Sequence, residues 1–124
     1  MIRISNLSAD IGGFSLKNVS LDIGDREFCV ILGPTGAGKT ILLECVAGLH
    51  RIKQGEIWVN GINAANLTPE DRNIGYVPQD YVLFPFLNVL DNITFGLRQA
   101  KYSKVDREGK AKALASLMGI SHLL

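Results

Sequence analysis

The sequence lacks the features that would tie it to secretion, to the inside of a membrane or to a charged polymer. No apolar run approaches the roughly 20 residues needed to span a bilayer, and the start, MIRISNLSAD, lacks the apolar core of a secretory signal. Thirteen basic and twelve acidic residues give a formal net charge of +1. This balance provides no strong attraction for nucleic acid or anionic lipid. We therefore expect a cytoplasmic protein that binds no nucleic acid.

Cysteine and histidine are also scarce. Cys29 and Cys45 both lie within apolar segments, and no second pair completes a metal-binding spacing. We expect reduced thiols that serve as small buried side chains. His50 and His122 have no neighbouring acid or nucleophile arranged for a proton relay, so both are expected to be ordinary surface residues.

The apolar pattern of the first half predicts strands around a glycine-rich loop. Residues 2–7 and 14–23 alternate as half-buried antiparallel strands do. Residues 28–32 are apolar without a break, which is typical of a central parallel strand covered on both faces. After the loop, residues 41–49 are apolar around much of a helical circumference, and Gly48 is the expected end of this helix.

The remaining pattern changes from short strands to helices. Residues 56–59 predict a strand that ends in an Asn-Gly turn, and Thr68 followed by proline predicts a helix start. Residues 74–77 predict another short strand. From Val89 onward we expect one helix through Leu97 and a second from about Val105 to Met118.

One motif points directly to chemistry. GPTGAGKT, residues 33–40, fits G-x-x-x-x-G-K-[ST] in full and lies between a predicted buried strand and a predicted helix, as a phosphate-binding P-loop requires. The glycines allow backbone conformations in which successive N–H groups turn toward a phosphate. The following helix offers further unpaired N–H groups and the positive end of its dipole.

Two side chains of this loop have expected parts in binding the phosphates of a nucleotide. Lys39 supplies a compact charge for the β- and γ-phosphate oxygens, and the Thr40 hydroxyl is an expected Mg²⁺ ligand. The predicted nucleotide-binding residues are Gly33, Pro34, Thr35, Gly36, Ala37, Gly38, Lys39, Thr40 and Ile41.

The chain resembles the N-terminal part of the nucleotide-binding domain of ABC transporters. The segments that carry the resemblance are LKNVSLDI, EFCVILGPTGAGKTILLECVAGL, GEIWVNG and NIGYVPQDYVLFPFLNVLDNITFGLR. The resemblance implies an α/β fold of the P-loop NTPase type, truncated here, with a central mostly parallel sheet, an N-terminal antiparallel strand region and the beginning of a helical subdomain. Residues 1–83 would be part of the ATPase core, and residues 84–124 would begin the helical subdomain.

The resemblance also implies roles for residues outside the P-loop. Gln79 matches the Q-loop glutamine, which ligates Mg²⁺ near the γ-phosphate, so Lys39 and Gln79 would be the catalytic residues and Thr40 and Gln79 the metal ligands. Phe14 is the nearest candidate for the aromatic that stacks on adenine, although its segment departs from the usual tyrosine pattern and its place in an alternating strand also suits the core. Four residues after the Q-loop would either receive the membrane subunits or belong to the core: Tyr81, Phe84, Phe86 and Leu87.

Other motifs of the family do not occur in these 124 residues. There is no Leu-Ser-Gly-Gly signature, no apolar strand ending in Asp-Glu and no switch histidine, so we expect this chain alone to be unable to hydrolyse ATP.

The leading interpretation is an ABC importer ATPase that binds transmembrane permease subunits, pairs with a second cassette and lies on the inner face of the cell membrane. The sequence around the P-loop and Q-loop is most similar to importers of oxyanions such as molybdate, tungstate or sulfate. The alternatives are a P-loop phosphotransferase, a cassette of DNA repair or translation, and a non-catalytic nucleotide-binding module.

Overall fold

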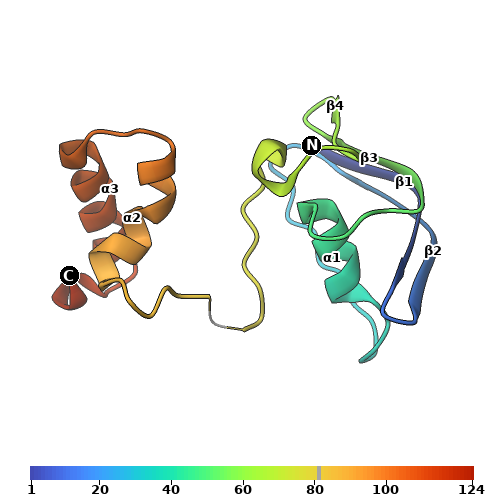
Figure 1. The fold of residues 1–124 in the computed structure, drawn as a ribbon, viewed down its shortest axis with the longest axis horizontal. Helices are drawn as coiled ribbons and strands as arrows, with labels where there is room; N and C mark the ends of the chain where they lie inside the picture. Colours follow the sequence, from blue (N-terminus) through green and yellow to red (C-terminus); the bar gives the residue numbers. More distant parts are fainter. Residues whose placement is uncertain (81) are drawn as a thin grey trace. The chain divides into compact units, whose positions relative to one another are not determined.

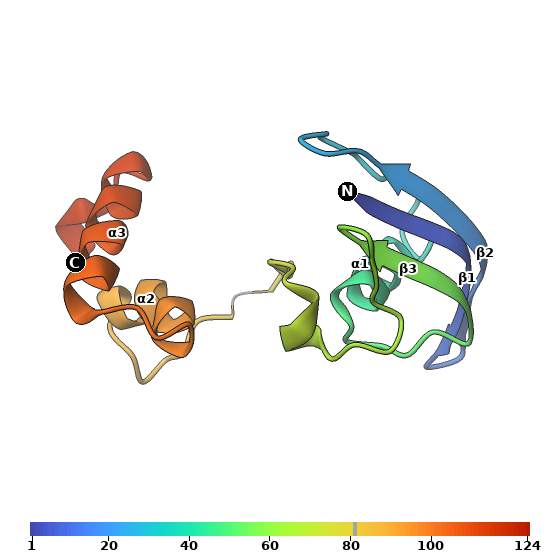
Figure 2. The same cartoon turned by 90° about the horizontal axis from the view of Figure 1, so that it is seen from above.

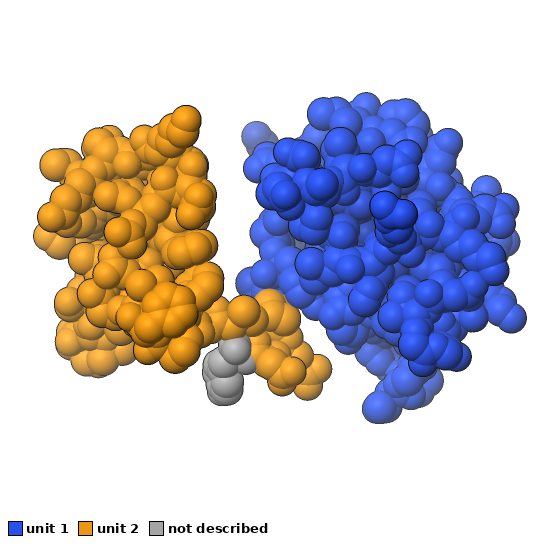
Figure 3. All heavy atoms as spheres, in the orientation of Figure 1, with its two compact units in different colours: residues 1–77 blue, residues 78–124 orange. Residues whose placement is uncertain are grey.

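The computed structural model describes residues 1–80 and 82–124, so Tyr81 lies outside the described residues. The chain forms two compact units, residues 1–77 and residues 78–124 (Figure 3). We describe each unit by itself.

The first unit contains a four-stranded antiparallel sheet. Its strands are β1 (Ile2–Ile11), β2 (Phe14–Ile23), β3 (Gln54–Val59) and β4 (Ile62–Asn63), in the order β2-β1-β3-β4 (Figure 1). The predicted strands at residues 2–7, 14–23 and 56–59 are therefore confirmed. The second has the predicted bounds, and the first and third are longer than predicted.

Helix α1 (Lys39–Ala47) covers one face of this sheet and completes the core of the unit (Figure 2). The buried cluster takes side chains from β1, β2, β3 and α1. Its largest fully buried side chains are Leu7, Ile57 and Cys45. The core thus fixes α1, and with it the end of the predicted P-loop, against the sheet.

One predicted turn, one predicted helix end and one predicted helix start are confirmed. Asn60 and Gly61 have φ values of 49° and 82°, the left-handed pair that a tight hairpin turn between β3 and β4 requires. Gly48 ends α1 with φ 88°. Thr68 precedes proline at the start of the short 3-10 helix η1 (Pro69–Arg72), as predicted. Its hydroxyl does not cap a main-chain amide, and instead donates to the Asp71 carboxylate at 2.9 Å.

Two segments predicted as strands, residues 28–32 and 74–77, join no sheet in the described part of the chain. Phe28 is 90% exposed and Leu32 87% exposed. A parallel strand depends on neighbouring strands and on covering layers, and the sheet of the described residues is wholly antiparallel. The apolar pattern identified segments suited to burial, and the described residues provide no strand to pair with them.

The second unit is a pair of helices followed by a short helical turn: α2 (Val89–Gln99), α3 (Lys104–Leu117) and η2 (Ser121–Leu123). Both predicted helices are confirmed, with ends shifted by one or two residues. Asn88 and Ser103 cap them by accepting hydrogen bonds from Asp91 N and Asp106 N. Across residues 1–80 and 82–124, no helix combines the length and the apolar character that crossing a bilayer demands.

Candidate nucleotide-binding site

The P-loop has the backbone conformation that its glycines allow. Gly36 and Gly38 have φ values of 81° and 90°, which residues with a Cβ rarely adopt. Gly38 is also the N-cap of α1 and offers no side chain there, so the first amides of the helix receive no side-chain cap. The loop therefore leads directly into a helix start that is suited to an anion.

Lys39 folds back over the loop that precedes it. Its Nζ donates to Gly33 O at 2.7 Å and to Pro34 O at 2.8 Å. Ala37 N donates to Pro34 O at 3.2 Å and closes the turn. The ammonium is thus held at the loop by two neutral carbonyls, which a phosphate oxygen can replace as a stronger, charged partner.

The charges around the start of α1 favour an anion. The first turn of α1 contains no acidic residue, and its N-terminus carries the positive end of the helix dipole. Thr40 is exposed in this turn. Its hydroxyl is a hard oxygen ligand of the kind that Mg²⁺ accepts in protein sites that also contain phosphate.

Phe14 lies against the P-loop. A Cβ added at Gly38 would lie 2.6 Å from Phe14 Cε1 and 2.9 Å from Leu16 Cδ2. Two features therefore favour glycine at position 38: the positive φ and the aromatic ring beside it. The half-buried Phe14 ring also packs against the core. The structure brings Phe14 to the loop, while its contact with adenine stays a prediction.

Gln79 is exposed and belongs to the second compact unit. Its predicted contact with the metal shared by Thr40 therefore stays a prediction. Among residues 1–80 and 82–124, no group of three or more His, Cys, Asp or Glu side chains is arranged to hold a metal ion.

Two sequence predictions for histidine and cysteine are wrong. His50, half-buried just beyond the end of α1, has an acidic partner within that helix, because its Nε2 lies 2.9 Å from Glu44 Oε2. Tyr76 donates to the other oxygen of Glu44 at 3.4 Å. Cys29 is exposed because its segment joins no sheet, whereas Cys45 is buried as predicted, and burial raises the pKa of its thiol.

Sequence reasoning missed Arg72. This side chain is only 4% exposed. Its Nη1 donates to Cys45 O at 2.8 Å and to Val46 O at 3.0 Å, at the end of α1. Burial lowers the pKa of its guanidinium. An arginine within Pro-Glu-Asp-Arg has the local pattern of a solvated turn, so no signal near it in the sequence indicates a partner 27 positions away.

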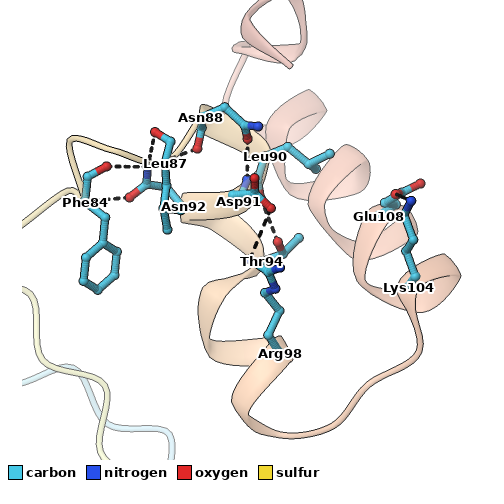
Figure 4. A network of polar contacts seen from close by, with 10 residues as sticks. All are labelled: Phe84, Leu87, Asn88, Leu90, Asp91, Asn92, Thr94, Arg98, Lys104 and Glu108. Atoms are coloured by element: carbon cyan, nitrogen blue, oxygen red, sulfur yellow. Dashed lines mark hydrogen bonds and ion pairs between the residues drawn. The ribbon is translucent and has the colours of Figure 1, made fainter.

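In the second unit, Asn92 organises the loop before α2 (Figure 4). Its Oδ1 accepts from Phe84 N at 2.9 Å, and its Nδ2 donates to the carbonyls of Phe84, Leu87 and Asn88 at 3.2, 3.0 and 3.0 Å. The Phe84 ring lies 4.4 Å from the Phe95 ring, centroid to centroid. Phe84 and Leu87 are therefore half-buried parts of the loop.

The same loop presents apolar side chains to solvent. Val82, Leu83 and Phe86 are 67%, 71% and 80% exposed. Of the residues predicted after the Q-loop either to receive the membrane subunits or to belong to the core, Phe84 and Leu87 are packed and Phe86 is exposed.

The sequence matches a known protein family over most of its length. The family model described as "ABC transporter" matches residues 16–124, which include the whole P-loop, Gln79 and both helices of the second unit. The chain belongs to the ABC transporter family. The predicted family and fold class are therefore confirmed, and this cassette shares its fold with solved members. ATP is the nucleotide that the family binds.

The chain is similar to ATP-binding proteins of import systems. The cassette is 51% identical to the molybdate/tungstate import ATP-binding protein WtpC of Methanocaldococcus jannaschii over all 124 residues, which cover 41% of that protein. It is 40% identical to the maltose/maltodextrin import ATP-binding protein MalK of Vibrio vulnificus over 87% of the chain and 29% of that protein. The chain thus spans less than half the length of these relatives.

A solved structure supports the same family. The ATP-binding cassette MJ0796, described as a dimer in a post-hydrolysis state bound to ADP and Pi, aligns with a TM-score of 0.76 at 30% identity. The alignment covers 90% of this chain and 54% of that one. The family match and this likeness do not favour the phosphotransferase alternative.

Proposed function

We propose that the chain is the ATP-binding part of the ATPase subunit of an ABC importer, which couples ATP binding and hydrolysis to solute uptake. The observation that carries the proposal is the P-loop itself. Gly36 and Gly38 adopt left-handed conformations, and Lys39 lies over the loop at the start of an uncapped helix. In this proposal residues 33–41 bind the phosphates, and Phe14 contacts the adenine.

The residues present fit Mg²⁺ as well as ATP. The metal would supply a positive charge that neutralises the β- and γ-phosphates. Thr40 would ligate it with a hydroxyl and Gln79 with an amide oxygen, and neither adds a negative charge that would repel ATP. Lys39 and Gln79 would then be the catalytic residues. Residues 1–83 would form the nucleotide-binding core, and residues 84–124 would begin the helical subdomain.

The proposed solute is an oxyanion such as molybdate or tungstate. The support is the shared name of several relatives, which are 41% to 51% identical over the whole chain and come from different archaea. Relatives named for maltose import are less similar, at 37% to 40% identity. Uptake of radiolabelled molybdate by cells that lack or carry the gene tests this assignment, and equal uptake would contradict it.

The proposed partners are permease subunits and a second cassette. The exposed apolar side chains of Val82, Leu83 and Phe86 offer a surface suited to docking. The pairing of cassettes is supported by the solved relative MJ0796, which is described as a dimer. The subunit would then lie on the inner face of the cell membrane. A Phe86→Cys variant is expected to crosslink to a membrane subunit in isolated membranes, and its failure to do so would contradict this docking surface.

ATP protection against unfolding tests the nucleotide site. A ligand at 100 times its Kd stabilises the folded state by about 2.7 kcal/mol, so MgATP should raise the thermal midpoint by several degrees. Lys39→Ala should abolish this rise, because it removes the only side-chain charge at the loop. The matched control is Lys17→Ala, which removes an exposed lysine from β2. Equal protection of the Lys39 and Lys17 variants would show that the loop is not the nucleotide site.

A further inference from the structure

Arg72 is the one charged side chain that is buried within the described residues. It connects two separate parts of the first unit. Besides its two bonds to the end of α1, its Nε donates to Leu67 O at 3.1 Å and its Nη2 approaches Ala65 O at 3.4 Å. The guanidinium therefore connects α1 with the chain between β4 and η1, the segment that leads toward Gln79.

The end of α1 needs such a partner. The last carbonyls of a helix have no partner within the helix, and here they are buried among Cys45, Val46 and Ala47. Two main-chain bonds satisfy part of this need: Gly48 N donates to Cys45 O at 3.2 Å, and Leu49 N donates to Glu44 O at 2.9 Å. Arg72 Nη1 adds the bond to Val46 O and a second one to Cys45 O.

Gly48 makes room for this arrangement. A Cβ at Gly48 would lie 2.6 Å from Arg72 Nε and 3.0 Å from Arg72 Cζ. The positive φ of 88° already favours glycine at this helix end. The guanidinium thus lies directly against the main chain at the point where α1 stops, which leaves little freedom for either to move.

Within residues 1–80 and 82–124, all the hydrogen-bond partners of Arg72 are main-chain carbonyls, and none is a carboxylate. Arginine stays protonated near neutral pH even when buried. Its charge is therefore placed at the negative end of the α1 dipole, where a cation is favoured. The opposite end of the same nine-residue helix, about 14 Å away, begins at Lys39.

We propose that Arg72 is a positioning residue for nucleotide binding: by fixing the carboxyl end of α1, it holds the amino end of that helix in the orientation that binds the phosphates of ATP. This inference rests on the proposed function of residues 33–41. It concerns the orientation of α1 and requires no contact between Arg72 and the nucleotide.

Calorimetric titration of the complete protein with MgATP tests the proposal, well below the thermal midpoint of each variant. Arg72→Gln keeps two amide hydrogens but cannot reach all four carbonyls, and we expect a Kd about 5- to 10-fold higher. Arg51→Gln is the matched control, because it removes one positive charge from an exposed residue just after α1. Its Kd should stay within twofold of the unmodified protein.

The titration separates positioning from stability alone. Well below the thermal midpoint nearly all molecules are folded, so a side chain that only stabilised the fold would leave the Kd unchanged. Irreversibly unfolded molecules would lower only the stoichiometry. A Kd for Arg72→Gln within twofold of the Arg51→Gln value would therefore overturn the proposal. Failure of the unmodified protein to bind ATP would instead refute the proposed function itself.

Arg72→Lys is the second variant, and it applies even where the glutamine variant does not fold. Lysine keeps the charge at the end of α1 but has no planar fork to span the separate carbonyls. We expect its Kd to rise at least threefold with a stoichiometry near one. A lysine variant that binds ATP as tightly as the unmodified protein would show that charge, not the position of the helix, is what Arg72 provides.

Discussion

At the scale of single residues, two of the three P-loop glycines, Gly36 and Gly38, differ in what an added side chain would contact. Gly36 and Gly38 share a positive φ, but a Cβ at Gly36 meets nothing within 4 Å, whereas one at Gly38 meets Phe14 and Leu16 at less than 3.0 Å. The first glycine is required by the backbone alone. The second is required by the backbone and by the ring beside it.

This difference predicts unequal effects of alanine. Gly36→Ala should cost about 1 kcal/mol of the free energy of unfolding, from backbone strain alone. Gly38→Ala should cost at least about 2 kcal/mol more, because the ring and the start of α1 must separate. Urea unfolding followed by circular dichroism measures both values. Similar losses for the two variants would contradict the contact between Gly38 and Phe14.

At the scale of elements, the Asn92 side chain adds four hydrogen bonds to the main-chain bond, from Leu87 N to Phe84 O, in the loop before α2. Asn92 offers both its oxygen and its nitrogen to main-chain groups of residues 84–88 (Figure 4). Asn88 caps the same helix through a single bond to Asp91 N at 2.8 Å. Asn92 thus holds the conformation of the loop, whereas Asn88 stabilises the start of the helix.

Hydrogen exchange at the Phe84 amide tests the role of Asn92. Asn92→Ala should remove the acceptor of this amide and raise its exchange rate at least about fivefold, since a lost bond of this kind is worth about 1 kcal/mol or more. Asn88→Ala should instead lower the stability of α2 by about 1 kcal/mol. It should leave Phe84 protected while the helix is folded. Equal exchange at Phe84 in both variants would show that Asn92 does not hold the loop.

Prediction from the sequence succeeded where the cause of a structure is local. Gly48, the Asn60-Gly61 turn and the Thr68-Pro69 helix start each act within a few residues, and all three lie where the pattern placed them. The P-loop was recognised for the same reason, because its spacing is a local requirement of phosphate binding.

Prediction failed where a partner is distant along the chain. Arg72 reaches carbonyls 26 and 27 positions before it, and Glu44 lies 32 positions before Tyr76. No periodicity encodes such a pair. Residues 28–32 failed for a related reason. Their apolar pattern predicts a buried strand, but the described residues provide no neighbouring strand to cover it.

At the scale of the whole molecule, residues 28–32 form a largely exposed apolar segment of the first unit. Phe28, Val30 and Leu32 are 90%, 60% and 87% exposed and belong to no strand of the described sheet. Exposed apolar surface of this kind, beside unpaired main-chain groups, promotes association with a further strand. In the family this chain belongs to, solved relatives are about twice as long as the part aligned here.

We therefore expect the 124-residue chain, produced alone, to bind the dye ANS and to associate at micromolar concentration. Phe28→Ser together with Leu32→Ser should lower ANS fluorescence and the scattering of light. The same change should alter the thermal midpoint by no more than a few degrees, because neither side chain contributes to the described core. Val59→Ser is the contrasting variant: it opens the core, and it should lower the midpoint and raise ANS binding. A serine pair at 28 and 32 that destabilises the chain as much as Val59→Ser would show that residues 28–32 are packed in solution.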